Sequence, residues 1–156
     1  KRLLQHERSG MASLVGAQSR DPGATLKEVA HSYLGTDEEG KVSDASIRAQ
    51  VINHEVNDAA FALTRKRTVQ EAEDGNTPGP ATSIFKMYGT ELEQEKSSLM
   101  CKIRGTQGIG WEGASFNEDE IEWTRAWLSN RAASIYSGTN EIQRNIIAKR
   151  VLGLPD

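Results

Sequence analysis

The sequence predicts an all-α fold, an antiparallel bundle of the four-helix type with additional short helices. Apolar residues recur every three or four positions over several long stretches, and no stretch shows the two-residue alternation typical of a strand. Glycine and proline interrupt these stretches. A chain of 156 residues can bury one continuous core without disulfides. We therefore expect a single helical domain over residues 1–156.

Six helices are expected, separated by clear breaks. In chain order they cover residues 1–18, 25–34, 43–74, 82–104, 117–136 and 139–152. Asp21-Pro22-Gly23 and Pro78-Gly79-Pro80 break the pattern because proline removes a helix donor. Ser43 and Thr139 are the expected N-caps of two of these helices. The chain opens at Lys1 as though already inside a helix, so we expect it to be a C-terminal piece of a longer protein.

Composition excludes several classes of function. The 22 acidic and 19 basic residues are mixed along the chain, so neither nucleic acid nor an anionic membrane is favoured as a partner. No apolar run approaches membrane-spanning length. Cys101 is the only cysteine and is expected to be a buried thiol. The three histidines lack metal-like spacing, so no metal site is expected.

The segment Tyr136-Ser137-Gly138-Thr139 is the strongest candidate for chemistry. A turn at Ser137-Gly138 precedes a helix that Thr139 caps, and such a turn presents backbone N–H groups. Backbone donors at a helix start suit an anion or an oxyanion. A plain turn between two helices explains the same residues, and both interpretations can hold together.

Four motifs resemble, in order and at compatible spacings, parts of the bacterial acyl-CoA dehydrogenases. They are Leu-Leu-Gln-His-Glu-Arg at 3–8, Gly-Pro-Ala-Thr-Ser-Ile-Phe-Lys-Met-Tyr-Gly-Thr-Glu-Leu at 79–92, Gly-Thr-Gln-Gly-Ile-Gly-Trp-Glu-Gly at 105–113, and the closing segment 136–155. Together they cover nearly the whole chain. The resemblance implies the C-terminal helical domain of a longer flavoenzyme that forms a double bond between the α and β carbons of an acyl-CoA thioester.

The resemblance raises the question of which residue is the base. In much of the family a catalytic glutamate stands directly before the Gly-Thr pair, where this chain has Ser137. In the isovaleryl and long-chain branches the base resembles Glu7 instead, and a small residue precedes Gly-Thr. The pair Glu7-Arg8 and the pair Ser137-Gly138 match that arrangement. We therefore expect Glu7 to be the base, the alternative being an ordinary surface glutamate on a helix.

Other roles also follow from the resemblance alone. The Ser137 backbone N–H corresponds to a donor to the thioester oxygen. Arg8, Tyr136 and Gly138 are assigned to substrate binding, although Tyr136 as a packing aromatic and Arg8 as a helix-surface ion-pair partner are alternatives.

The cofactor implied by the family is FAD. Thr139, Glu141, Gly105 and Thr106 are the expected contacts, with simple helix capping as the alternative for the first two. The Gly105–Gly110 segment is not taken as a dinucleotide fingerprint, because a helix and not a strand precedes it. Trp111 and Trp123 are expected to be packing residues, with ligand contact as the alternative.

Two departures from the family concern this cofactor. The acidic loop 36–40 replaces an arginine-containing loop, and acidic residues repel a pyrophosphate. Lys102 stands where relatives carry a glutamine that contacts the cofactor.

The resemblance also implies partners and a setting. These are an acyl-CoA substrate, an electron-transfer flavoprotein or similar acceptor, and a homo-oligomer or heteromer. The bacterial cytoplasm is the expected location, with organelle targeting left open. A second hypothesis is a non-catalytic, flavin-deficient subunit of a heteromer that serves assembly, and a third is a stand-alone helical interaction module. The 156-residue piece alone is expected to be inactive.

Overall fold

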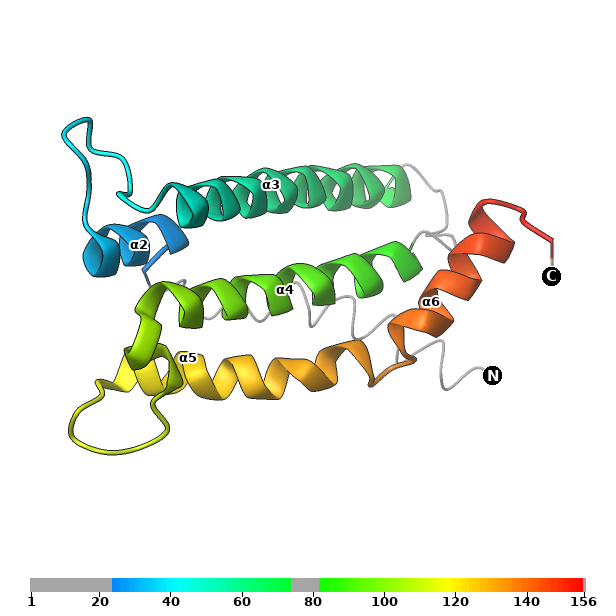
Figure 1. Cartoon of the computed structure of the whole chain (residues 1–156). Helices are drawn as coiled ribbons and strands as arrows, with labels where there is room; N and C mark the ends of the chain where they lie inside the picture. Colours follow the sequence, from blue (N-terminus) through cyan, green and yellow to red (C-terminus); the bar gives the residue numbers. More distant parts are fainter. Residues whose placement is uncertain (1–23, 74–81, 156) are drawn as a thin grey trace. The chain divides into compact units, whose positions relative to one another are not determined.

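All regular structure in the described part of the chain is helical. The computed structural model describes residues 24–73 and 82–155, which contain helices and a single isolated bridge between Thr36 and Val42 (Figure 1). This confirms the predicted all-α fold. The expected helix over 1–18 and the break at 78–80 lie outside the described residues. Within the described ranges, no helix is both long and apolar enough to cross a bilayer.

Helix α2 forms where the sequence predicts it. It covers Leu26–Leu34 and starts with a capping box: the Thr25 hydroxyl accepts from the Glu28 N–H at 3.2 Å, and the Glu28 carboxylate accepts from the Thr25 N–H at 2.7 Å. Gly35 ends the helix at φ 70°, a conformation that favours glycine.

The two long helices follow. Helix α3 covers Ala45–Glu73, and Asp44 Oδ1 accepts from the Ile47 N–H at 2.9 Å at its start. The predicted cap at Ser43 is therefore wrong by one residue, because the Asp44 carboxylate reaches the third N–H of the helix. Helix α4 covers Thr82–Arg104, with the predicted boundaries.

Two segments depart from the expected helices and loops. The glycine-rich segment begins with a 3-10 helix, η1, over Gly105–Ile109. Helix α5 covers Glu118–Ser129 and is followed by a 3-10 helix, η2, over Asn130–Ser134, so one regular helix to residue 136 is wrong. Asn130 lies where the α-helix changes to the 3-10 helix. Its carbonyl accepts a hydrogen bond from the Gln94 side chain at 2.8 Å.

The described residues form two compact units, each discontinuous in sequence. The turn unit contains 59–73, 82–91 and 132–155, and the pocket unit contains 24–58 and 92–131. The turn unit includes the Tyr136–Thr139 turn and the pocket unit includes the glycine-rich segment.

The pocket unit has an apolar core contributed by α2, α3, α4 and the loop between α2 and α3. Its buried members are Leu26, Val29, Ala30, Val42, Ile47, Val51, Leu99, Met100 and Ile103. Lys102 Nζ donates to Gln50 Oε1 at 2.9 Å, and His54 Nδ1 lies 3.0 Å from Glu95 Oε2. Gln50 of α3 thus meets Lys102 of α4, and His54, one turn later in α3, meets Glu95, which is earlier in α4. The two helices therefore run antiparallel in this unit.

The turn unit is organised around aromatic and amide side chains. The Phe61 ring meets Phe85 and Tyr88 edge to face, with centroids 5.9 and 5.5 Å away. Helix α6 covers Asn140–Ile146 and continues as a π-helix, η3, over Ile147–Val151. Asn140 and Gln143 are buried in α6, whereas Ile142 is 47% exposed.

Candidate functional site

The turn before α6 has a constrained backbone. Ser137 has φ 57° and Gly138 has φ 90°, and Ser137 is the one residue other than glycine with positive φ among those described. Before the turn, the Tyr136 N–H donates to the Ala132 carbonyl at 3.1 Å. After it, Thr139 Oγ1 accepts from the Ile142 N–H at 3.4 Å, which confirms the predicted N-cap. The residues flanking Ser137 are thus tied to the helices on either side.

The start of α6 is anchored to α4 by the side chain of Asn140. Its Oδ1 accepts from Lys86 Nζ at 2.8 Å, and its Nδ2 donates to Thr90 Oγ1 at 3.2 Å and to the Met87 carbonyl at 3.4 Å. Asn140 is 4% exposed, so these bonds satisfy a buried amide. Burial lowers the pKa of Lys86, and the carboxylates of Glu141 and Glu91 partly counteract that effect.

Glu141 supplies a negative charge beside the turn. Its own backbone N–H and the Thr139 hydroxyl hold the pKa of its carboxyl below the usual value. The side chain is exposed, and Arg144 Nη1 lies 3.7 Å from its Oε1. An exposed carboxylate at this position can accept hydrogen bonds from hydroxyl or N–H groups of a ligand.

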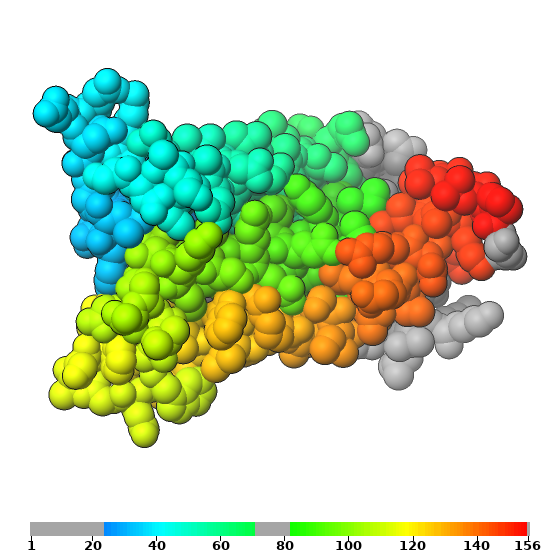
Figure 2. Space-filling view, viewed as in Figure 1, coloured from blue at the N-terminus to red at the C-terminus, as the bar shows by residue number. Residues whose placement is uncertain are grey.

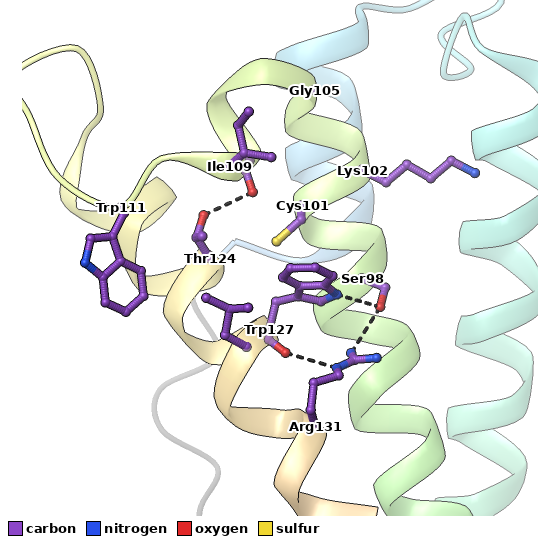
Figure 3. Close-up of a pocket in the computed structure, with 11 residues that line it drawn as sticks. Ser98, Cys101, Lys102, Gly105, Ile109, Trp111, Thr124, Trp127 and Arg131 are labelled. Carbon is purple, nitrogen blue, oxygen red and sulfur yellow. Dashed lines mark hydrogen bonds between the residues drawn. The ribbon is translucent and has the colours of Figure 1, made fainter.

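The pocket unit contains a cavity of about 680 Å³ between the end of α4, η1 and α5 (Figure 3). The residues that line it are Ser98, Cys101, Lys102, Gly105, Gly108, Ile109, Trp111, Thr124, Trp127, Leu128 and Arg131. The Trp127 Nε1 donates to Ser98 Oγ at 3.1 Å, and burial raises the pKa of the Cys101 thiol. The volume lies within the range of small-molecule sites, roughly 300–1,000 Å³.

The cations at this cavity are engaged with the protein itself. Figure 3 shows the Lys102 side chain extending away from Trp127, and its Nζ donates to Gln50. The Arg131 guanidinium lies 5.5 Å from the Trp127 ring centroid and donates to the Trp127 carbonyl. Trp123 packs against the apolar core as expected, whereas Trp111 is 52% exposed and its ring centroid lies 5.1 Å from the Arg125 guanidinium. The cavity therefore offers indole and aliphatic surface more than an anion site.

Gly108 in η1 allows the backbone of η1 to pack closely against the end of α4. A Cβ at Gly108 would lie 2.0 Å from the carbonyl oxygen of Cys101, a distance no side chain tolerates. The Gly108 carbonyl in turn accepts from Thr124 Oγ1 at 3.0 Å. Helix α4 precedes this segment, which agrees with the rejection of a dinucleotide fingerprint.

The acidic loop between α2 and α3 is ordered by its own charges. Asp37 Oδ1 accepts from the Glu39 and Lys41 N–H groups at 3.0 and 2.9 Å, and Arg48 Nη1 lies 3.6 Å from Asp37 Oδ2. The loop residues, coloured cyan, project from the surface beside α2 (Figure 2). Glu38 and Glu39 are exposed, which disfavours a phosphate in their vicinity.

The described residues match a flavin cofactor in part. In the pocket unit, exposed Trp111 and half-buried Trp127 offer flat surfaces for a planar ring. In the turn unit, taken by itself, the exposed Glu141 carboxylate offers a hydrogen-bond acceptor. A pyrophosphate needs cations, and both cations that line the cavity already bond to the protein: Lys102 to Gln50, and Arg131 to the Trp127 carbonyl. In residues 24–73 and 82–155 no three His, Cys, Asp or Glu side chains come together as a metal site.

The predicted site residues fall into three groups. Tyr136, Ser137, Gly138, Thr139 and Glu141 lie together in the turn unit. Gly105 and Thr106 lie in the pocket unit, Gly105 at the cavity wall and Thr106 exposed. Glu7 and Arg8 lie outside the described residues.

Two residues of the site were missed by sequence reasoning. Asn140 and Gln143 support the turn from α6, both below 5% exposure. Their three-residue spacing, which places both on one helix face, is the signal that would have indicated them.

Comparison with known proteins establishes the family. The family model described as acyl-CoA dehydrogenase, C-terminal domain, matches residues 1–152. The chain belongs to this family, and its described part has the helical fold expected for it. This confirms the resemblance carried by the four motifs.

Curated relatives of this chain are mycobacterial. The acyl-CoA dehydrogenase IpdE1 of Mycobacterium tuberculosis is 58% identical over 100 residues, which cover 60% of this chain and 25% of that protein. IpdE1 of Mycolicibacterium smegmatis is 40% identical over 82 residues, covering 53% and 20%. The chain therefore spans about a quarter or less of the length of these relatives.

Solved structures share the fold. The Tcur3481–Tcur3483 steroid ACAD superposes with a TM-score of 0.72 at 22% identity, covering 98% of this chain and 38% of that one. The ChsE4–ChsE5 complex from Mycobacterium tuberculosis gives a TM-score of 0.66 at 24% identity, covering 85% and 35%. At these identities the likeness concerns the fold alone.

Proposed function

We propose that the chain is the C-terminal helical domain, over residues 1–156, of an FAD-dependent acyl-CoA dehydrogenase that introduces an α,β double bond into an acyl-CoA thioester. The observation that carries this proposal is the family match over residues 1–152, which includes the turn before α6. A carbon next to a thioester carbonyl is a weak acid, so the reaction needs a carboxylate base and donors to the carbonyl oxygen.

The proposal assigns these tasks to residues at the two ends of the chain. Glu7 removes the α proton, and the Ser137 backbone N–H donates to the thioester oxygen where negative charge develops. Arg8, Tyr136 and Gly138 bind the substrate. A serine hydroxyl cannot replace the carboxylate, and for this reason the base is placed at Glu7.

FAD is the proposed acceptor of the hydride from the β carbon. Thr139, Glu141, Gly105 and Thr106 are the residues of this chain proposed to contact it. When bound, FAD would supply the hydride acceptor, and the proposed partner that reoxidises it is an electron-transfer flavoprotein or a similar acceptor. A bacterial cytoplasmic setting and an oligomer, homomeric or heteromeric, complete the proposal.

The experiment uses the full-length protein, an acyl-CoA panel and an artificial electron acceptor. The proposal predicts a product lighter by two hydrogen atoms and one FAD per polypeptide. A purified protein that lacks flavin and turns over no acyl-CoA contradicts it and favours an assembly subunit instead. The acidic loop 36–40 and the bond between Lys102 and Gln50 are the reasons to test this second candidate.

A further inference from the structure

Gln143 lies one turn inside α6, and its side chain reaches back to the turn. The residue is 2% exposed, and its Nε2 donates to the Ser137 carbonyl and to the Gly138 carbonyl, both at 3.3 Å. A Cβ at Gly138 would lie 3.0 Å from the same Nε2, so the amide is packed against the turn backbone. One buried amide thus bonds to both central residues of the turn.

The turn conformation needs such support. A residue other than glycine is strained in the left-handed region, and Ser137 has φ 57°. Strained backbone of this kind persists where surrounding contacts determine it. The Tyr136 N–H holds the chain before Ser137, and the Gln143 amide holds the two peptide groups after it.

The platform for Gln143 is itself fixed. Asn140 stands three residues earlier on the same face of α6 and is bonded to Lys86 and Thr90 of α4. Gln143 therefore projects from a helix start whose position is set by a buried hydrogen-bond network. The hydrogen bonds from the Gln143 amide therefore hold the turn backbone in a fixed position relative to α6.

We propose that Gln143 is a positioning residue for the oxyanion donor. It holds the peptide groups that follow Ser137 and so helps to fix the φ angle of Ser137, which sets the direction of the Ser137 N–H relative to them. This inference rests on the proposed function. Without the amide donor, the backbone at Ser137 relaxes toward ordinary dihedral angles and its N–H turns away from the thioester oxygen. An oxyanion donor acts chiefly in the transition state, so the loss falls on kcat more than on KM.

The test uses the full-length holoenzyme with Gln143→Leu and Gln143→Glu. Removal of one oxyanion donor costs ~10²–10³-fold in kcat, so misorientation is expected to cost at least ~10-fold with KM nearly unchanged. Exchange of the acyl-CoA α hydrogens with D2O, which reports enolate stabilisation without hydride transfer, should fall in parallel. The matched control Gln70→Leu makes the same substitution at an exposed position of α3 and should leave both rates unchanged.

The glutamate variant separates positioning from general stability. Its carboxylate repels the two carbonyl oxygens, but its protonated form donates an O–H to one of them. We therefore expect kcat of Gln143→Glu to recover, relative to wild type, as pH falls through the carboxyl pKa. Near wild-type kcat and α exchange in either variant, or a glutamate variant with the wild-type pH profile, would overturn the inference. An inactive wild type that exchanges no α hydrogen would instead overturn the proposed function.

Discussion

Asn140 in α6 and Lys86 in α4 are joined by a 2.8 Å hydrogen bond that ties the candidate oxyanion turn to a long helix. The same amide bonds to the buried Thr90 hydroxyl, so its removal takes the acceptor from Lys86 Nζ and one of the hydrogen bonds of Thr90. Polar contacts therefore stabilise the turn unit at α6, and each buried polar group in this network needs its hydrogen-bond partner.

Replacement of Asn140 by leucine should lower the free energy of unfolding by about 1–3 kcal/mol, the cost of buried polar groups left without partners. Urea denaturation of the full-length protein, followed by tryptophan fluorescence, measures the change. Asn53→Leu makes the same substitution at an exposed position of α3 and is the control. Equal stability of the two variants would argue against the Asn140 network as a source of stability.

The hydrogen bond between Tyr33 and Glu120 should stabilise the folded protein only within a limited pH range. The Tyr33 hydroxyl donates to Glu120 Oε1 at 2.6 Å; this bond chiefly holds the pKa of Glu120 below its ordinary 4.5. Burial first, and then the bond to Glu120, raises the pKa of Tyr33 above its ordinary 10.0. The glutamate contribution is therefore lost as pH falls below 4.5, and the tyrosine contribution is lost as pH rises through the raised value.

Tyr33→Phe tests this window. The difference in unfolding free energy between wild type and variant should be largest between the two limits and shrink toward both. Denaturation at a series of pH values gives the difference directly. A difference that stays constant from acid to alkaline pH would show that the bond does not carry the pH dependence.

Gly108→Ala should disrupt η1, because the added Cβ would meet the Cys101 carbonyl at 2.0 Å. Overpacking of this kind typically costs about 1–3 kcal/mol or more. The control is Gly40→Ala, where φ is 74° but no atom lies within 4 Å, so only the backbone preference of about 1 kcal/mol is lost. Melting temperatures that fall by the same amount in both variants would contradict the close packing of η1.

Ser137→Ala and Ser137→Gly should keep kcat within about threefold of wild type, since a backbone donor survives a side-chain change and one lost donor costs ~10²-fold or more. Steady-state turnover of the full-length enzyme is the measurement. A loss of ~10²-fold in Ser137→Ala would assign the role to the hydroxyl group instead of the N–H.

Most helix boundaries were predictable from the sequence, because they depend on local chemistry. Helix α4 begins and ends where apolar spacing predicts, and Thr25 and Gly35 flank α2 as their cap preferences require. The cap of α3 was misplaced by one residue because Ser43 and Asp44 are both good caps, and only the bond to Ile47 N–H distinguishes them.

The support of the candidate site was not predictable, because it depends on contacts distant in sequence. Asn140 and Gln143 are polar and yet buried in α6, whereas the apolar Ile142 between them is 47% exposed. The turn residues themselves were predicted, since their motif is local. The roles of Glu7 and of the Ser137 N–H remain proposals that rest on the family.

The assignment of Glu7 as the base of an acyl-CoA dehydrogenase is tested most directly by Glu7→Gln in the full-length protein. The measurements are kcat and the exchange of the substrate α hydrogens. The amide keeps the size of the side chain but cannot accept the α proton. Because general base catalysis contributes ~10²–10⁴-fold, both rates should fall by that factor with FAD still bound. Turnover within a few-fold of wild type would contradict the assignment of Glu7 as the base.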